Sequence, residues 1–229
     1  MDHKPKSFPL VNLETIRNSP HIRKYLGIGD QYLEVIGTIQ HDEPHANLVA
    51  HGTREILLKL GYSQREAELG AIAGYLHDIG NIMNRYNHGL TGAILSFNLL
   101  RELSMDAEEM AIVMSAIGNH EENTGGNPVN NVTAALILAD KSNVHRSRVR
   151  KADPASFTPR DRVNFAVESS CLEVFPEEKL ITMKLKIDTN ICSVMEYFEI
   201  FLTKMILCRH AAGALGCQFE LLINDVKLL

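Results

Sequence analysis

The sequence YLHDIGN occupies residues 75–81 and ends a helix that is predicted to begin near Gln64. Small and apolar residues recur along this segment at helical spacing, and the same face leads to His77 and Asp78. Small side chains there would let neighbouring helices approach closely, and Gly80 would end the helix just beyond. The pattern therefore directs a histidine and an aspartate toward the core, where neither is stable without a strong partner.

The same arrangement recurs on neighbouring predicted helices. Five consecutive helices direct six side chains inward: His45, His77, Asp78, His88, His120 and Asp140. Any one of them alone is more readily explained as a hydrogen-bonded core residue. Their repetition favours one common partner, and a divalent metal ion is the simplest. His51 falls beside the apolar stripe of its helix, so we expect it to be a supporting or surface residue.

Composition limits the class of protein. The chain has 229 residues, of which 45% are hydrophobic and 22% charged, as expected for one large or two small folded domains. A net charge of -5 argues against nucleic acid as a partner. Four cysteines without CxxC spacing are predicted to be buried, reduced thiols. With no apolar signal segment and no uncharged spanning helix, the predicted location is the cytoplasm, away from membranes.

The N-terminal two thirds of the chain has a helical period. From about residue 30 to residue 149 apolar residues recur at helical spacing, with short polar breaks. Asp30, Ser63 and Asp106 are predicted helix N-caps. Residues 151–159 (KADPASFTP) form a predicted linker.

Beyond the linker the period changes. Residues 181–188 alternate between apolar and polar, which predicts a half-buried strand, and residues 163–175 are its predicted hairpin partner. A helix at about 190–215 is expected to stop at Gly216, and residues 219–223 mark a last strand.

The predicted fold is therefore mainly α. A helical metal-binding domain at residues 1–150 precedes a small α+β domain (strand, strand, helix, strand) at residues 160–229. The sequence assigns no function to the second domain. Oligomerisation is one role, since two such domains can pair sheet edges or helices to make a homodimer.

The inward-facing residues resemble the HD superfamily of metal-dependent phosphohydrolases. The matched elements are His45, the pair His77-Asp78 in YLHDIGN, and Asp140 in LILADKS. In NHGLTGA and AIGNHEE, His88 and His120 match the additional histidines of the two-metal HD subclass. The resemblance covers roughly residues 42–150, about half the chain. It implies an all-helical HD-type domain that hydrolyses a phosphoester or phosphoanhydride.

The resemblance also implies a ligand set. One metal would take His45, His77, Asp78 and Asp140, and a second would share Asp78 and take His88 and His120. Glu121 stands where related two-metal proteins often carry another ligand or a site histidine. The residues Gly80-Asn81, directly after the His-Asp motif, differ from the sequence patterns of two HD subgroups. Cyclic-dinucleotide hydrolases usually carry Lys at the second position and a GYP run further on, and guanosine tetraphosphate hydrolases carry an acidic pair.

Imidazole and carboxylate ligands together suit Mn, Fe, Co, Ni or Zn better than Mg or Ca, although Mg stays among the candidates. Two such ions roughly 3.5–4 Å apart would generate a bridging hydroxide at neutral pH, so no side-chain nucleophile is required. A phosphate substrate also needs cations, and KSNVHRSRVRK follows Asp140 directly. If the helix continues, Lys141, Arg146 and Arg148 are candidate substrate-binding residues. A solvated basic helix end is an equal alternative for Arg146 and Arg148.

The predicted function is metal-dependent hydrolysis of a nucleotide-like, phosphorylated small molecule, with Asp78, Glu121 and Lys141 as catalytic residues and two divalent ions as cofactors. Two alternatives stay open. The helical domain could hold metal as a sensor or scaffold without turnover, or it could be a one-metal HD nucleotidase.

Overall fold

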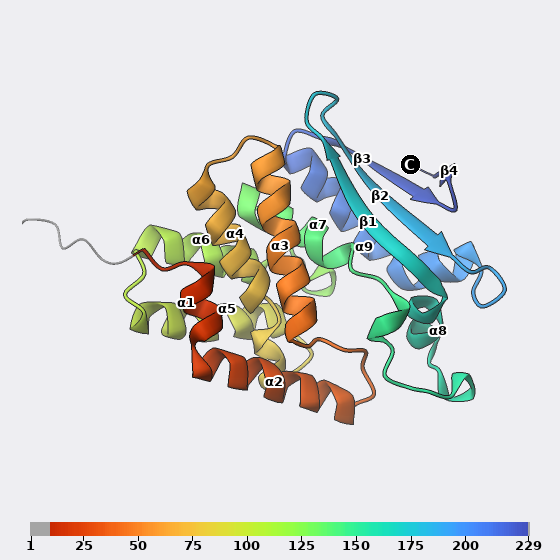
Figure 1. The fold of residues 1–229 in the computed structure, drawn as a ribbon, viewed down its shortest axis with the longest axis horizontal. Coiled ribbons are helices and arrows are strands. Elements are labelled where there is room, and N and C mark those ends of the chain that lie inside the picture. Colours follow the sequence, from red (N-terminus) through yellow and green to blue (C-terminus); the bar gives the residue numbers. More distant parts are fainter. Residues whose placement is uncertain (1–9, 229) are drawn as a thin grey trace, which may run out of the picture.

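A computed structural model describes residues 10–228 (Figure 1). Helices build the first part of the chain, with bounds α1 Leu13–Asn18, α2 Pro20–Val35, α3 Glu43–Lys59, α4 Gln64–Leu76, α5 His88–Glu102, α6 Ala107–Gly118 and α7 Asn131–Lys141. Short 3-10 turns lie at η1 Ile79–Ile82, η2 Glu122–Thr124, η3 Arg146–Arg148 and η4 Pro154–Ser156. The remainder comprises α8 Pro159–Ala166, β1 Val167–Phe175, β2 Leu180–Ile187, α9 Val194–Ala214, β3 Gln218–Ile223 and β4 Val226–Lys227.

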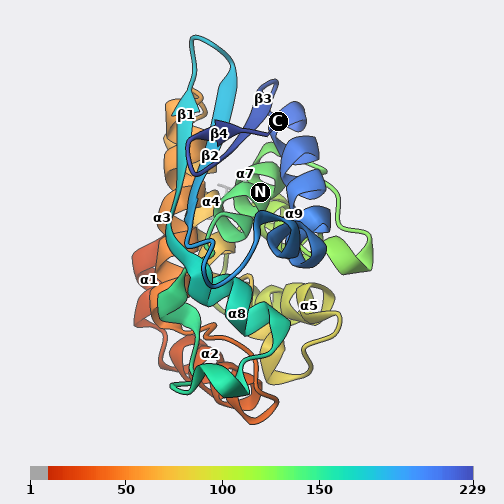
Figure 2. The ribbon, with the colours of Figure 1, turned by 90° about the vertical axis from the view of Figure 1, so that its right-hand side faces the viewer.

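The fold is mainly α with a small α+β part at its C-terminal end, as predicted. One sheet has the order β1-β2-β3-β4. β1 and β2 form the predicted antiparallel hairpin, whereas β2 and β3 are parallel and are joined through α9. Figure 2 shows α9 beside the sheet, and its contacts with both β3 and α7 join the sheet to the helices. Buried apolar side chains from both parts form one cluster, and the predicted division into two domains stays a prediction.

Helix starts follow local capping chemistry. Ser63 caps α4 in a capping box with Glu66, and the Asp106 carboxylate accepts hydrogen bonds from two main-chain N–H groups of α6. These two N-cap predictions are confirmed. The prediction for Asp30 is wrong, because α2 already begins at Pro20 and Asp30 lies inside it. Its carboxylate instead accepts from the main-chain N–H of His41 at 2.6 Å.

Local signals also correct the C-terminal part. Residues 163–166, predicted as strand, belong instead to α8, where Thr158 forms a capping box with Asp161 and Pro159 occupies the first turn. The predicted helix near residue 190 starts later, because Ser193 caps α9. A short strand, β4, extends the sheet beyond the predicted last strand.

Two further expectations are wrong. The helix that carries Asp140 does not continue through the basic run, because α7 ends at Lys141. Of the four free cysteines only three are buried; Cys171 lies exposed on the edge strand β1.

Among residues 10–228, every helix is too short or too polar to cross a membrane.

The close contact of α3 with α4 depends on Gly74. A Cβ atom at this position would lie 2.7 Å from the Ala50 Cα atom, a backbone contact that cannot give way cheaply. We expect Gly74→Ala to lower the free energy of unfolding by about 1–3 kcal/mol through overpacking. Thermal denaturation followed by circular dichroism measures this. Gly213→Ala in α9 is the matched control, since a Cβ atom added there would meet nothing within 4 Å and alanine favours the helix. Equal stability of the Gly74→Ala protein and the wild type would contradict the expected clash.

Candidate metal centre and its cavity

The structure brings together the six side chains that the sequence directs inward. On one side, the His77 Nε2 atom lies 3.1 Å from Asp78 Oδ2 and 3.6 Å from Asp140 Oδ1. The His45 Nε2 atom lies 3.5 Å from the same Asp78 oxygen and 3.6 Å from the same Asp140 oxygen. These two imidazoles and two carboxylates enclose one point, although they come from α3, α7 and the C-terminal end of α4.

A second group lies on the other side of Asp78. The His88 Nε2 atom is 3.2 Å from Asp78 Oδ1 and 3.1 Å from the Nε2 atom of His120. The two oxygens of the Asp78 carboxylate therefore face different histidine pairs. Three sets of three ligand atoms, each set within 4.8 Å, can be drawn from this cluster: His45, His77 and Asp78; His77, His120 and Asp140; Asp78, His88 and His120.

Helix ends and glycines hold these residues together. His77 is the C-cap of α4, Asp78 precedes η1, and His88 is the first residue of α5. Gly80 lets η1 pack directly on α5, because a Cβ atom there would lie 2.0 Å from the His88 carbonyl oxygen. Any larger residue at Gly80 would push His88 away from Asp78, so this glycine sets the width of the cluster.

Each histidine is oriented by a hydrogen bond at its outer nitrogen. The Nδ1 atoms lie near these acceptors: Asn143 Oδ1 at 3.0 Å from His45, Gly74 O at 2.8 Å from His77, Glu121 Oε1 at 2.7 Å from His88 and Ile117 O at 2.6 Å from His120. All four acceptors need a donor, so the four Nδ1 atoms are assigned as protonated. The four Nε2 atoms then present lone pairs to the centre, as metal ligation requires.

The centre contains polar atoms that protein partners do not satisfy. Among the described residues, the buried atoms His45 Nε2, His77 Nε2 and Asp78 Oδ2 have no hydrogen-bond partner. The Nε2 atoms of His88 and His120 lie 3.1 Å apart, so one of them must carry a proton for the two rings to share a hydrogen bond, and a metal ion would take the place of that proton. Buried orphan atoms of this kind are rare in folded proteins, and a metal ion satisfies all of them at once. The residues present therefore fit a metal site.

The pKa values of the clustered histidines also indicate that the two carboxylates favour a positive charge beside them. Burial disfavours a charged imidazole, yet the Asp78 and Asp140 carboxylates raise the pKa of His77 to about 10. Burial and the neighbouring Arg148 lower the pKa of His45 to about 4, and burial with His88 lowers the pKa of His120 to about 3. The two carboxylates thus favour positive charge on a buried imidazole beside them, and a divalent ion would supply the same charge.

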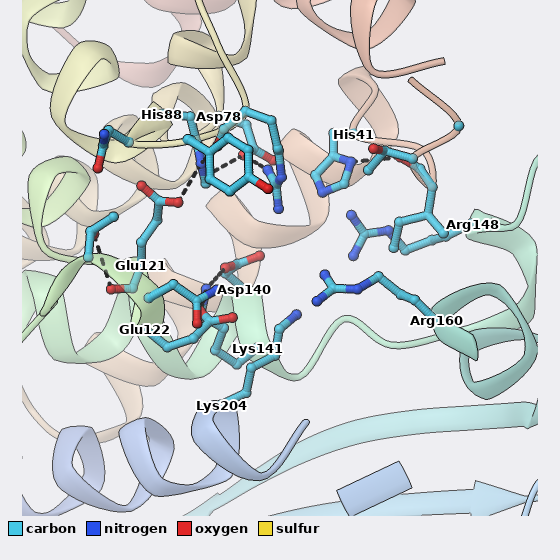
Figure 3. A pocket seen from close by; sticks show the side chains of 18 of the residues that line it. His41, Asp78, His88, Glu121, Glu122, Asp140, Lys141, Arg148, Arg160 and Lys204 are labelled. Atoms are coloured by element: carbon cyan, nitrogen blue, oxygen red, sulfur yellow. Dashed lines mark hydrogen bonds and ion pairs between the residues drawn. The ribbon is translucent and has the colours of Figure 1, made fainter. Parts of the chain in front are cut away.

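A cavity of about 600 Å³ opens beside this cluster. Asp78, His88 and Asp140 form part of its wall. Five cationic side chains border it as well: Arg85, Lys141, Arg148, Arg160 and Lys204. Figure 3 shows the last four of them. A polar cavity of this size with metal ligands on one side suits a small anionic ligand.

Lys141 and Glu121 lie next to the ligands, as predicted from their place in the chain. The Lys141 Nζ atom is 2.8 Å from Asp140 Oδ2 and 2.9 Å from Glu122 Oε2. Despite burial, the Lys141 charge lowers the pKa of Glu122 to about 2. Glu121 lies behind His88, where its second oxygen accepts from the main-chain N–H of Gly89 at 2.9 Å. It therefore orients His88 and is not among the inward-facing ligand atoms.

The two candidate arginines lie apart. Arg148 is buried at the edge of the cavity, and its guanidinium donates to the main-chain oxygens of Gln40 and Asn143. Arg146 is absent from the described cavity wall; it lies over the Phe165 ring and 3.6 Å from Glu168. The early end of α7 explains this separation, because η3 turns the two side chains in different directions.

Sequence reasoning missed several residues of the cavity. Arg85, Arg160 and Lys204 border it, and Asn143 orients His45. Asn143 follows Asp140 by three positions, but α7 ends at Lys141, so the chain beyond the helix places Asn143 beside His45. Lys204 follows Phe201 by three positions, so a charged residue lies on the apolar face of its helix, which could have indicated a cation directed toward the interior. His51 is exposed and lies outside this wall, as expected for a surface residue.

Comparisons with known proteins give one partial similarity. No protein-family model matches the chain, and no curated protein matches it. A solved structure described as a predicted HD superfamily hydrolase, from an uncultured Thermotogales bacterium, is 25% identical in sequence. The match covers 58% of this chain and 73% of that chain, with a TM-score of 0.43. The two backbones overlap only modestly.

The two histidine groups predict a metal stoichiometry. We expect about two equivalents of a transition metal per wild-type chain, and about one in His88→Ala, since only the second group loses a ligand. Asp78→Ala should retain little metal because both groups use its carboxylate. Elemental analysis after reconstitution and desalting measures this, with His51→Ala as control. A single equivalent that His88→Ala leaves unchanged would instead indicate a one-metal site.

Glu121 predicts a measurable effect on affinity. Glu121→Gln removes the charge that fixes His88, so we expect metal affinity to fall roughly 10–100-fold, as for other residues that orient metal ligands. Competition with a chelating dye measures the change. Glu108→Gln on the exposed start of α6 is the matched control. If both variants bind metal like the wild type, the contact between Glu121 and His88 has no role in binding.

Proposed function

We propose that this protein is a metal-dependent phosphohydrolase that acts on a phosphoester or phosphoanhydride of a nucleotide-like small molecule. The observation that carries the proposal is the juxtaposition of six inward-facing metal ligands with a cation-lined cavity. The ligands can hold a metal ion, and the cations of the cavity wall can bind a negatively charged substrate next to it. Its cofactors would be two divalent ions, of an identity that the donor set leaves open between Mn, Fe, Co, Ni, Zn and Mg.

Bound divalent ions lower the pKa of a ligated water and thereby supply a nucleophile at neutral pH. The chain's own groups are consistent with water in that role, since no serine or cysteine occurs among the described residues of the cavity wall. One metal would be held by His45, His77, Asp78 and Asp140. The other would be held by Asp78, His88 and His120.

The remaining polar groups have supporting tasks. Lys141 holds Asp140 in place and reduces the negative charge next to the substrate. Glu121 fixes the ring of His88. Arg148 is fixed at the cavity edge by main-chain carbonyls and adds positive charge that favours an anionic substrate in the cavity. Arg146 is the other predicted substrate-binding residue, and its position against Phe165 favours a structural role.

Two alternatives belong to other classes. A metal-holding sensor or scaffold would use the same ligands without turnover. A one-metal nucleotidase would use the first group alone. The second group of ligand atoms, from Asp78, His88 and His120, favours a second metal over this last alternative. Cytoplasmic location and assembly as a homodimer remain predictions of the sequence.

Phosphatase assays with the Mn-loaded protein test the proposal. We expect turnover of p-nitrophenyl phosphate and of a panel of nucleotides, loss on chelation, and recovery when Mn is restored. Asp78→Ala should lower kcat/KM by at least roughly a thousandfold, because it removes ligands from both groups. His51→Ala should retain activity. Tight metal binding without turnover of any phosphoester would indicate a sensor or scaffold.

A further inference from the structure

The cavity wall on the side away from His88 carries cations from the C-terminal part of the chain. Arg160 comes from α8, Lys204 from α9 and Arg148 from η3, and their charged ends point into one space (Figure 3). Arg160 and Lys204 both contact the ring of Phe201, at 5.9 Å and 4.8 Å from its centre. These three side chains, Arg148, Arg160 and Lys204, are called the cationic clamp below.

The cationic clamp lacks a protein counter-ion. Among residues 10–228, no carboxylate forms an ion pair with any of its three members. Other cations at the cavity or near it are paired: Lys141 with Asp140 and Glu122, Arg85 with Asp78, and Lys151 with Asp161. Asp161 also borders the cavity, but the same Oδ2 atom that binds Lys151 accepts from Thr158. The nearest carboxylates are therefore already committed elsewhere.

The Arg148 guanidinium is held without being neutralised. Its Nε and one terminal nitrogen donate to the Gln40 carbonyl at 3.0 and 2.8 Å, and its other terminal nitrogen donates to the Asn143 carbonyl at 2.7 Å. Main-chain carbonyls fix the orientation of the group but carry no net charge. Arg148 therefore contributes a fixed positive charge, whereas Arg160 and Lys204 keep donors for a ligand.

Like charges grouped in a partly buried place are unfavourable unless an anion joins them. Burial lowers the pKa of Lys204 to about 8 although the charge of Glu122 opposes this, and Lys141 and Arg160 lower it further. Burial also lowers the pKa of Arg148 and of Arg160. An isolated surface cation is usually stabilised by water alone. Here the three cations converge on one cavity, and Arg160 and Lys204 both contact the ring of Phe201. Grouped cations of this kind are typical of a site that binds an anion.

We propose that the substrate carries two anionic groups, the scissile phosphoryl group at the metal cluster and a second phosphate or carboxylate held by the cationic clamp. This inference rests on the proposed function and adds the class of substrate. It also assigns a role to the C-terminal part, since α8 and α9 complete the cavity and select substrates by their second charge.

Equilibrium binding tests the inference without requiring turnover. The Mn-loaded full chain is titrated calorimetrically with α,ω-alkanediyl bisphosphonates of three to eight carbons, which cannot be hydrolysed. Matched alkyl monophosphonates and ω-carboxyalkyl phosphonates separate the contribution of a second phosphoryl group from that of a carboxylate. We expect one chain length of the ligands with two anionic groups to bind at least roughly tenfold more tightly than the monophosphonate, as one or two charge-assisted contacts allow.

Variants assign this preference to the cationic clamp. Arg160→Gln and Lys204→Met should each reduce the ratio of the two affinities by about tenfold, while Lys204→Arg should largely keep it. Arg162→Gln is the matched control, because Arg162 lies on the same helix but pairs with Glu196. Metal content and circular dichroism verify that each variant is folded and loaded.

The outcomes are separable. Equal affinities for the monophosphonate and for the ligands with two anionic groups, at every chain length, would overturn the cationic clamp. A preference for two anionic groups that survives both Arg160→Gln and Lys204→Met would also overturn it. A preference that these variants abolish would support the clamp even if the wild type hydrolyses no phosphoester. That combination would reject the proposed hydrolase and leave a receptor for a dianionic molecule.

Discussion

The helical part of this protein is arranged around the buried carboxylate of Asp78. One of its oxygens faces His45 and His77 and the other faces His88, so a single side chain connects both halves of the cluster. A buried carboxylate is strongly unfavourable unless positive charge and hydrogen bonds surround it. Three features meet this demand here: the imidazoles, the amide of Asn81 at 2.8 Å, and the space for a cation that the orphan atoms define.

That demand explains the unusual packing nearby. For four imidazoles and two carboxylates to meet, their helices must come closer than large side chains allow. Gly74 places α4 directly on the backbone of α3, and Gly80 places η1 directly on α5. The small residues that the sequence shows before His77 are therefore a geometric condition for the site. Core packing and site geometry depend on the same positions.

Much of this could be predicted from the sequence, because burial imposes a period that local residues reveal. Helix periods located α3 to α7 and directed six polar residues inward, and the structure brings all six together. Errors arose where capping or tertiary contacts override the period. Asp30 resembled an N-cap, but the apolar face of α2 starts earlier, at Ile22. Residues 163–166 resembled a strand, but the capping box at Thr158 starts a helix there.

The cationic clamp is the part of the cavity that hydrophobic periodicity in the sequence could not predict. Arg160 and Lys204 are separated by more than forty positions and meet over Phe201 only because α8 and α9 fold back on the helical part. A lone lysine in an apolar helix is ambiguous in sequence, since its long stem can reach solvent from many positions. In the structure it turns instead into a cavity that Asp78, His88 and Asp140 also border. The cavity therefore combines metal ligands with the cationic clamp, and a ligand with two anionic groups can engage both, whereas a ligand with a single anionic group can engage only one.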